Sequence, residues 1–212
     1  MNMKDMSVAQ LAALTASDAP APGGGSIAAL SGAYAAALAA MVASLTLGKK
    51  GYEEVQGEMK QVAAQAETLR EELLEAIQKD SASFDAYMAA LGLPKETEEQ
   101  KTLRRAAMQE ALKEAAQVPY HTAELAAAVL PLAETVVRLG NSNAVTDGLV
   151  SAMMARTAVR GALLNVKINL DSIKDEDFTA QLRDKCNVLE GQVIAAETHV
   201  LSLQPQLAYC GK

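Results

Sequence analysis

Asp80 is the carboxylate whose neighbours best suit acid/base chemistry in this sequence. It lies in the stretch KDSASFDAY, one helical turn before Phe84 and three residues after Ile77. An acid that shares a helix face with these apolar side chains is expected to be partly buried, and burial raises the pKa of a carboxyl group toward a range useful for proton transfer. The alternative is a surface ion pair with Lys79 or Lys50.

A glycine-rich loop is the second candidate, in the stretch DAPAPGGGSIAALSG. Gly23, Gly24 and Gly25 leave their N–H groups free of side chains, and Ser26 can cap the alanine-rich helix that follows. Free N–H groups at the positive end of a helix predict a site for an anion or a carbonyl group. The alternative is a tight connection between packed helices. A nucleotide P-loop or Rossmann turn is excluded, because both need a preceding strand.

Two further polar stretches could hold a ligand. LTLGKKGY places Lys49 and Lys50 beyond an apolar helix, where they either compensate the helix dipole or bind a multiply anionic ligand. GNSNAVTDG contains Asn141, Asn143 and Asp147, the last two one turn apart at a predicted helix start. Amide and carboxylate groups there could read the edge of a heterocycle. The alternative is that Asn143 or the serine before it only caps the helix.

About six helices must position these groups, and we expect one all-α domain over residues 1–212. Alanine is abundant and favours close-packed helices, while β-branched runs are scarce. Thr97 is expected to cap the fourth helix, and Pro119 and Pro131 should kink or break it. The apolar periodicity and the turn residues predict helices at roughly residues 5–16, 26–47, 52–91, 97–139, 144–170 and 176–203.

Residues 27–47 contain no charge and are long enough to span a bilayer. Nine of them are alanine and only six are Leu, Ile or Val, so we expect the buried centre of a soluble bundle rather than a membrane helix. Ala28, Gly32, Ala36 and Ala40 repeat every four residues. This smooth stripe invites close packing by another helix, or by its own copy in a homodimer.

Composition excludes several classes of function. The net charge of −7 argues against a nucleic-acid partner, whose binding surface should be basic. Cys186 and Cys210 have no zinc-site or disulfide-framework spacing. His121 and His199 are expected to be ordinary surface side chains, so no metal site is expected. The N-terminal stretch MNMKDMSVAQL shows no secretory pattern, which predicts a cytoplasmic protein.

The ordered set of motifs resembles the cyclodeaminase family, the C-terminal domain of formiminotransferase-cyclodeaminase and its stand-alone relatives. PGGGS, the apolar helix, GKKGY, DSASF, LPKETEEQKTLR, AAQVPY and GNSNAVTD follow in the family's order over about residues 5–170. The resemblance implies an all-α homodimer that acts on folates, including polyglutamylated ones, without metal or redox cofactor. We expect the stand-alone, single-domain form, and association with a separate formiminotransferase stays open.

The resemblance also implies roles for the candidate residues. Asp80 matches the proposed proton donor, and residues 23–26 would hold the pterin or a carboxylate. The other candidates divide between the glutamate tail (Lys49, Lys50) and the pterin (Asn141, Asn143, Asp147), with Tyr52 beside the lysine pair as a further binding residue.

Three functions stay open at this point, two enzymatic and one non-catalytic. A cyclodeaminase would convert 5-formiminotetrahydrofolate to 5,10-methenyltetrahydrofolate and release ammonia, as in histidine degradation. A methenyltetrahydrofolate cyclohydrolase would open the same product with water to 10-formyltetrahydrofolate. A non-catalytic helical scaffold would explain the alanines but not the combination of polar motifs.

Overall fold

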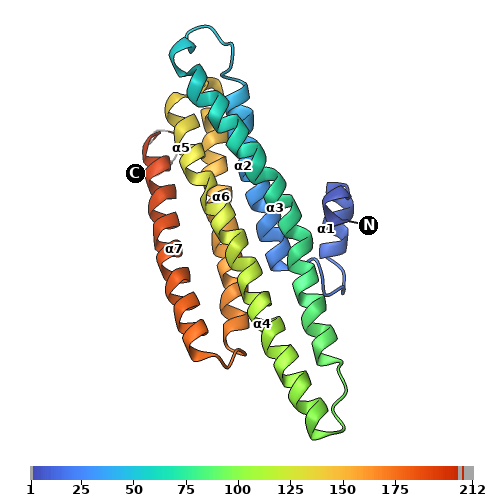
Figure 1. Cartoon of the computed structure of the whole chain (residues 1–212). Coiled ribbons are helices and arrows are strands. Elements are labelled where there is room, and N and C mark those ends of the chain that lie inside the picture. The colour runs from blue at the N-terminus through green and yellow to red at the C-terminus, as the bar shows by residue number, and fades with distance from the viewer. Residues whose placement is uncertain (1, 205–206, 208–212) are drawn as a thin grey trace.

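The computed structural model describes residues 2–204 and 207, which form a long all-α bundle and contain no strand (Figure 1). The all-α prediction is confirmed; Cys210 lies outside the described residues. The α-helices are α1 (Val8–Thr15), α2 (Gly24–Ser44), α3 (Gln56–Leu91), α4 (Glu98–Ala127), α5 (Val129–Leu139), α6 (Val145–Leu170) and α7 (Glu176–Ser202). Short 3-10 helices lie at η1 (Met3–Asp5), η2 (Glu53–Val55) and η3 (Ser142–Ala144).

The predicted helix over residues 97–139 is two helices. Thr97 caps α4 as expected, in a capping box with Gln100. Pro119 stays inside α4, and the chain breaks instead at Ala128. Pro131 falls in the first turn of α5, where a backbone N–H has no intrahelical partner to lose. The break therefore precedes Pro131 rather than falling at either proline.

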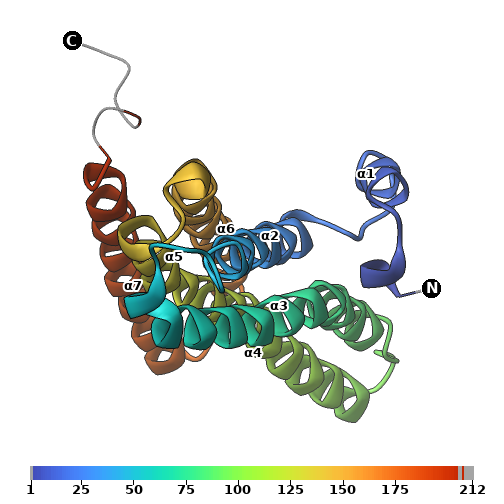
Figure 2. The same ribbon diagram turned by 90° about the horizontal axis from the view of Figure 1, so that it is seen from above.

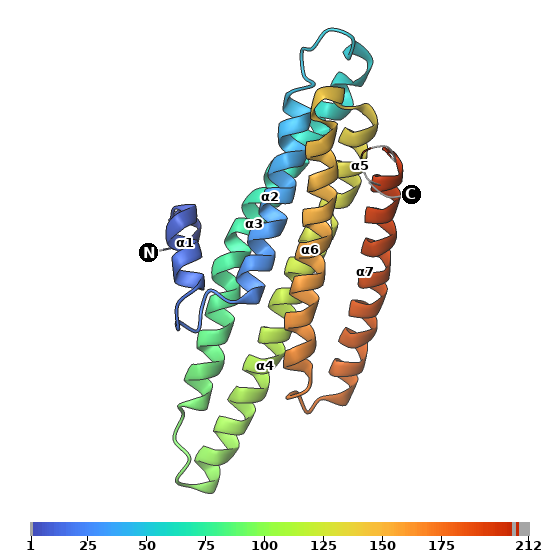
Figure 3. The same ribbon diagram turned by 180° about the vertical axis from the view of Figure 1, so that it is seen from behind.

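Helix α2 is the centre of the bundle and packs mainly against α3 and α6, beside which it lies in Figure 3. A Cβ added at Gly32 would lie 3.0 Å from Leu73 of α3 and 3.3 Å from Ala126 of α4. A Cβ on Gly161 of α6 would lie 3.2 Å from that of Ala28. The small-residue stripe, as far as Ala36, is therefore buried against helices of its own chain.

By length and composition α2 could also cross a membrane. Its most apolar window has a mean hydropathy of 1.7, and 56% of that window is buried inside the bundle. Burial of this kind is typical of a core helix, as predicted for this segment.

Helix α1 stands apart from the bundle (Figure 2). Its sequence VAQLAALT carries no charge, and Leu11 is its only buried residue. A helix of eight residues is marginal in water on its own, so α1 depends on tertiary contacts for its stability.

Candidate active site

The centre of the candidate site is Asp80, which points from α3 at the first turn of α2. The hydroxyl of Ser26 lies 2.8 Å from Oδ2 of Asp80 and 3.2 Å from the carbonyl oxygen of Ile77. The hydroxyl of Ser81 is 3.5 Å from that of Ser26. Two segments 54 residues apart in the sequence thus meet in one small polar cluster.

Gly25 is the glycine that this cluster requires. A Cβ at position 25 would lie 2.1 Å from Oδ1 of Asp80 and 2.7 Å from its Cγ, well inside any real contact. A Cβ at Gly24 would make ordinary contact with Asn165, and a Cβ at Gly23 would meet nothing within 4 Å. The glycine loop was expected to approach a ligand. Gly25, its third glycine, instead lacks a side chain because the Asp80 carboxyl group occupies that space.

The pKa of Asp80 is raised above its usual range, chiefly because burial penalises the charged carboxylate. The side-chain and backbone hydrogen bonds from Ser26 oppose this shift in the pKa. Phe84 was expected to help bury the Asp80 carboxyl group but is itself 38% exposed. The carboxyl group is covered instead by the start of α2 at Gly25. The alternative ion pair with Lys79 or Lys50 does not form among the described residues.

The predicted cap of α2 was wrong. Gly23 occupies the N-cap position without a side-chain hydrogen bond, and Ser26 lies inside the first turn, where its hydroxyl reaches Asp80 instead. The N-cap residue therefore supplies no capping side chain, and within the first turn the Asp80 carboxylate of α3 accepts the backbone N–H of Ser26.

A second polar group surrounds Lys49, beyond the other end of α2. The Lys49 ammonium donates to Oδ1 of Asn141 at 2.6 Å and lies 5.6 Å from the centre of the Tyr52 ring. Asn141 is buried, donates its side-chain amide to the carbonyl of Leu45 (3.3 Å), and accepts the backbone N–H of Asn143 (3.1 Å). Asn141 therefore ties the α2–η2 loop to the start of α6, and it also caps η3 in place of Asn143.

The remaining predicted residues flank this group. Tyr52 accepts the backbone N–H of Ser142 at 3.0 Å, and the two hydroxyls are 3.4 Å apart; these contacts lower the pKa of the Tyr52 phenol. Lys50 and the Asn143 side chain are exposed, and Asp147 is half-buried, with no partner among the described residues. These three side chains are free to meet a ligand, and their binding roles remain predictions.

The two groups lie at opposite ends of α2. The 21 residues of that helix span about 30 Å, so Asp80 and Lys49 of one chain cannot contact the same atom of a ligand. The sequence motifs placed all these residues in one site without indicating this separation.

One residue that the motifs missed is Asn165 of α6, which lies beside Gly24. Asn165 and Asn169 are uncharged amides within the largely apolar stretch GALLNVKINL, and such an interruption is a signal for a polar site. In the part of the chain that the structure describes, no three His, Cys, Asp or Glu side chains gather as a metal site would require. His121 and His199 are on helix surfaces, beside Glu124 and Glu134.

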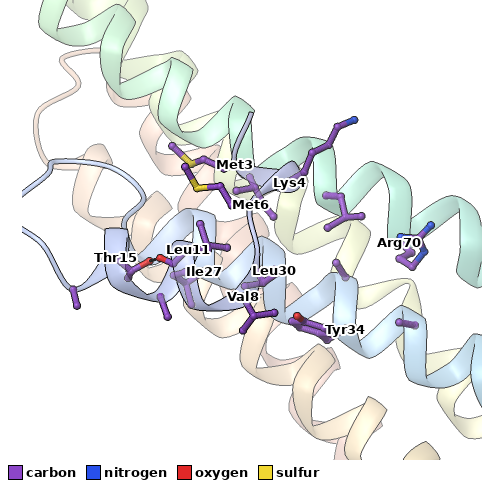
Figure 4. A pocket seen from close by; sticks show the side chains of 16 residues that line it. Met3, Lys4, Met6, Val8, Leu11, Thr15, Ile27, Leu30, Tyr34 and Arg70 are labelled. Atoms are coloured by element: carbon purple, nitrogen blue, oxygen red, sulfur yellow. Dashed lines mark hydrogen bonds between the residues drawn. The ribbon is translucent and has the colours of Figure 1, made fainter. Parts of the chain in front are cut away.

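A mostly apolar cavity of about 540 Å³ lies between α1, η1, α2 and α3 (Figure 4). Leu11 and Val8 of α1 face Ile27 and Leu30 of α2 across it. Asp80 does not line this cavity, although Ile77, one turn earlier on α3, does. The cavity therefore adjoins the Asp80 cluster without containing it.

Comparison with known proteins gives consistent matches. The family model described as formiminotransferase-cyclodeaminase matches residues 7–188. The methenyltetrahydrofolate cyclohydrolase of Methylorubrum extorquens is 44% identical over 181 residues, which are 85% of this chain and 86% of that protein. The formimidoyltransferase-cyclodeaminase of Sus scrofa is 37% identical over 169 residues, 80% of this chain but 31% of the pig protein.

A solved structure extends the match to the whole fold. The crystal structure of a formiminotetrahydrofolate cyclodeaminase from Thermotoga maritima superposes with a TM-score of 0.87 at 30% identity. The superposition covers 97% of this chain and 99% of that one.

Proposed function

Since the chain belongs to the formiminotransferase-cyclodeaminase family, we propose that it is an enzyme acting on the carbon held between N5 and N10 of tetrahydrofolate. The observation that carries this proposal is a half-buried carboxyl group of raised pKa, held by Ser26 at the bare start of α2. The first candidate activity is methenyltetrahydrofolate cyclohydrolase, because the relative of that name matches at 44% identity over most of both chains.

In the cyclohydrolase reaction, water attacks the cationic methenyl carbon and Asp80 accepts one of its protons. The resulting tetrahedral carbon carries N5, N10 and a hydroxyl group. The bond from carbon to N5 then breaks, N5 takes the proton from Asp80, and the hydroxyl proton leaves to solvent as the formyl C=O forms. A raised pKa suits a group that must both accept and return a proton near neutral pH.

The second candidate is formiminotetrahydrofolate cyclodeaminase, favoured by the Thermotoga maritima structure. N10 attacks the formimino carbon and its proton passes to the imine nitrogen, giving a tetrahedral carbon that bears both ring-forming nitrogens and an amino group. Asp80 protonates that amino group, which leaves as ammonia while the methenyl cation forms. Both reactions move only protons and close or open one ring, so we propose that neither requires a metal or redox cofactor.

The proposal includes a homodimer, because one chain separates its two polar groups by the length of α2. An antiparallel pair related by a two-fold axis near the middle of α2 would bring the Asp80 cluster of one protomer beside the Lys49 group of its partner. Each site would then have a proton-transfer group from one chain and cations for the glutamate tail from the other.

The outer face of α2 and α6 supports this pairing. It is apolar along most of both helices, as expected of a surface covered by a partner, and its exposed charge on α6, Arg160, pairs with Glu190 of α7. Its exposed members are Ile27, Tyr34, Met41 and Leu45 on α2 and Val150, Met153, Leu164 and Ile168 on α6. The uncharged α1 and its cavity adjoin this face at Ile27 and Tyr34.

The activity is tested by the near-ultraviolet absorbance of 5,10-methenyltetrahydrofolate. The protein should speed decay of the absorbance if it is a cyclohydrolase, and should generate the absorbance from 5-formiminotetrahydrofolate if it is a cyclodeaminase. Asp80→Asn should lower kcat by about 10²–10⁴-fold while folate binding survives. Decay at the buffer rate together with no product from the formimino substrate would contradict both activities.

The shared site is tested by mixing two impaired variants, assayed with polyglutamylated substrate well below the KM of the lysine variant. Asp80→Asn protomers and protomers with both Lys49 and Lys50 changed to Ala each lack one half of the proposed site. After denaturation and joint refolding, mixed dimers should recover up to about a quarter of parental activity on polyglutamylated substrate, because half the dimers are mixed and each has one intact site. No recovery, or a stable monomer in sedimentation at micromolar concentration, would refute the shared site.

A further inference from the structure

Asn165 is held against the start of α2 by close packing of α6. Gly161 lies one turn before it and meets Ala28, while Asn165 meets Gly24, one turn before Ala28 on the antiparallel helix. A Cβ at Gly24 would lie 3.4 Å from Nδ2 and 3.8 Å from Oδ1 of Asn165. The position of this side chain is therefore fixed by the contact between two core helices.

The two polar atoms of the Asn165 side chain have different surroundings. Its Nδ2 donates to the carbonyl oxygen of Gly161 at 2.9 Å. Its Oδ1 has no hydrogen-bond partner among the described residues, although the side chain is half-buried. The nearby cation Lys167 donates to Glu190 at 2.7 Å and is not directed at this oxygen. An acceptor is thus left open beside the glycine loop.

Asp80 and Asn165 flank the first turn of α2 on different sides. Successive residues of a helix point about 100° apart, and Asp80 occupies the direction of the missing side chain of Gly25. Asn165 lies in the direction of the missing side chain of Gly24. Two oxygen-bearing side chains, from α3 and α6, therefore border the uncapped end of α2.

We propose that Asn165 binds the substrate through Oδ1 and stabilises the positive charge of the N5–C–N10 unit, from a different side of the first turn of α2 than the proton-transfer group Asp80. This inference rests on the proposed function, in which both the methenyl group and the protonated formimino group are cations. The positive end of the α2 dipole would repel such a cation, and an amide oxygen offsets that repulsion. An amide also stays neutral, so it does not compete with Asp80 for the proton.

The test compares two folates in an Asp80→Asn background, where the bound ligand should not turn over. The cationic ligand is 5,10-methenyltetrahydrofolate, and the reference is 5-formyltetrahydrofolate, which lacks the positive charge. Asn165→Leu should raise the Kd of the cationic ligand by roughly 10-fold or more, the effect of losing a hydrogen bond to a charged group, and that of the reference by less than about threefold. Asn165→Asp, which keeps an acceptor, should bind the cation at least as tightly as the Asp80→Asn parent.

Thr198→Val is the matched control, because Thr198 is an exposed residue of α7 whose hydroxyl bonds only to its own helix. It should change neither Kd. Equal weakening of both ligands by Asn165→Leu, or no weakening of either, would overturn the role of Asn165 while leaving the proposed function intact. If the Asp80→Asn parent binds neither folate although the unaltered enzyme turns one over, Asn165→Leu is compared in the unaltered enzyme instead, where an unchanged KM would refute the role of Asn165. If the unaltered protein also lacks activity, the proposed function itself falls.

Discussion

Replacing Gly25 by alanine tests whether the position of Asp80 matters for catalysis. The added Cβ would lie 2.1 Å from Oδ1 of Asp80, whereas an ordinary contact is at least 3.4 Å. The carboxyl group must therefore move by more than about 1 Å, and a misplacement of that size typically costs about 10²-fold in rate. The move also disturbs the 2.8 Å hydrogen bond from Ser26.

The expected result for Gly25→Ala is a fall in kcat of about 10²-fold with a folded protein. Overpacking costs about 1–3 kcal/mol of stability, partly offset because alanine favours the helix by about 0.5–1 kcal/mol. Steady-state kinetics on methenyltetrahydrofolate and a thermal melt measure the two effects. Gly191→Ala in α7 is the matched control, since its Cβ also meets nothing within 4 Å, and it should retain kcat. If Gly25→Ala keeps kcat within about threefold of the parent, the reasoning from Asp80 geometry to catalysis is wrong.

Three further predictions follow from the described contacts. Asp80→Asn should raise the free energy of unfolding at neutral pH and leave it unchanged below the ordinary pKa of a carboxyl group. The reason is that the pKa of Asp80 is raised in the folded protein, so ionising it costs stability as the pH rises. Urea titrations in which the effect of the substitution does not depend on pH would argue against burial as the cause. Lys50→Ala should raise KM for polyglutamylated folate but not for a tail-less analogue. Lys49→Ala should have the same effect on KM and should also lower Tm, because it removes the hydrogen bond to Asn141. Equal KM effects on both substrates would exclude the glutamate tail as the ligand of these lysines. Gly32→Leu should cost about 1–3 kcal/mol or more in a thermal melt, since the residue is packed inside its own chain, and an unchanged Tm with a weakened dimer would contradict that placement.

The sequence by itself determined the helical class, most helix positions and the family. Helix periodicity, capping residues such as Thr97 and turn glycines are local signals, so they can be read without knowledge of the fold. The motifs likewise identified Asp80 and the glycine loop as polar features in an apolar chain. The order of those motifs indicated the family that the comparisons confirm.

The tertiary structure decided which of these residues meet. Ser26 and Asp80 are 54 positions apart, and Lys49 and Asn141 are 92 apart, so no local pattern pairs them. Contacts at such separations depend on which helix faces pack together, and many packings are compatible with the same periodicity.

The same reason explains the remaining differences. Only the packing of α3 on α2 shows that Gly25, rather than Gly23, must lack a side chain. Only the packing of α6 on α2 places Asn165 beside the loop. The separation of the two polar groups by the length of α2 is also a property of the assembled bundle, because a sequence motif records the type and order of its residues but not the end of the molecule at which each will lie.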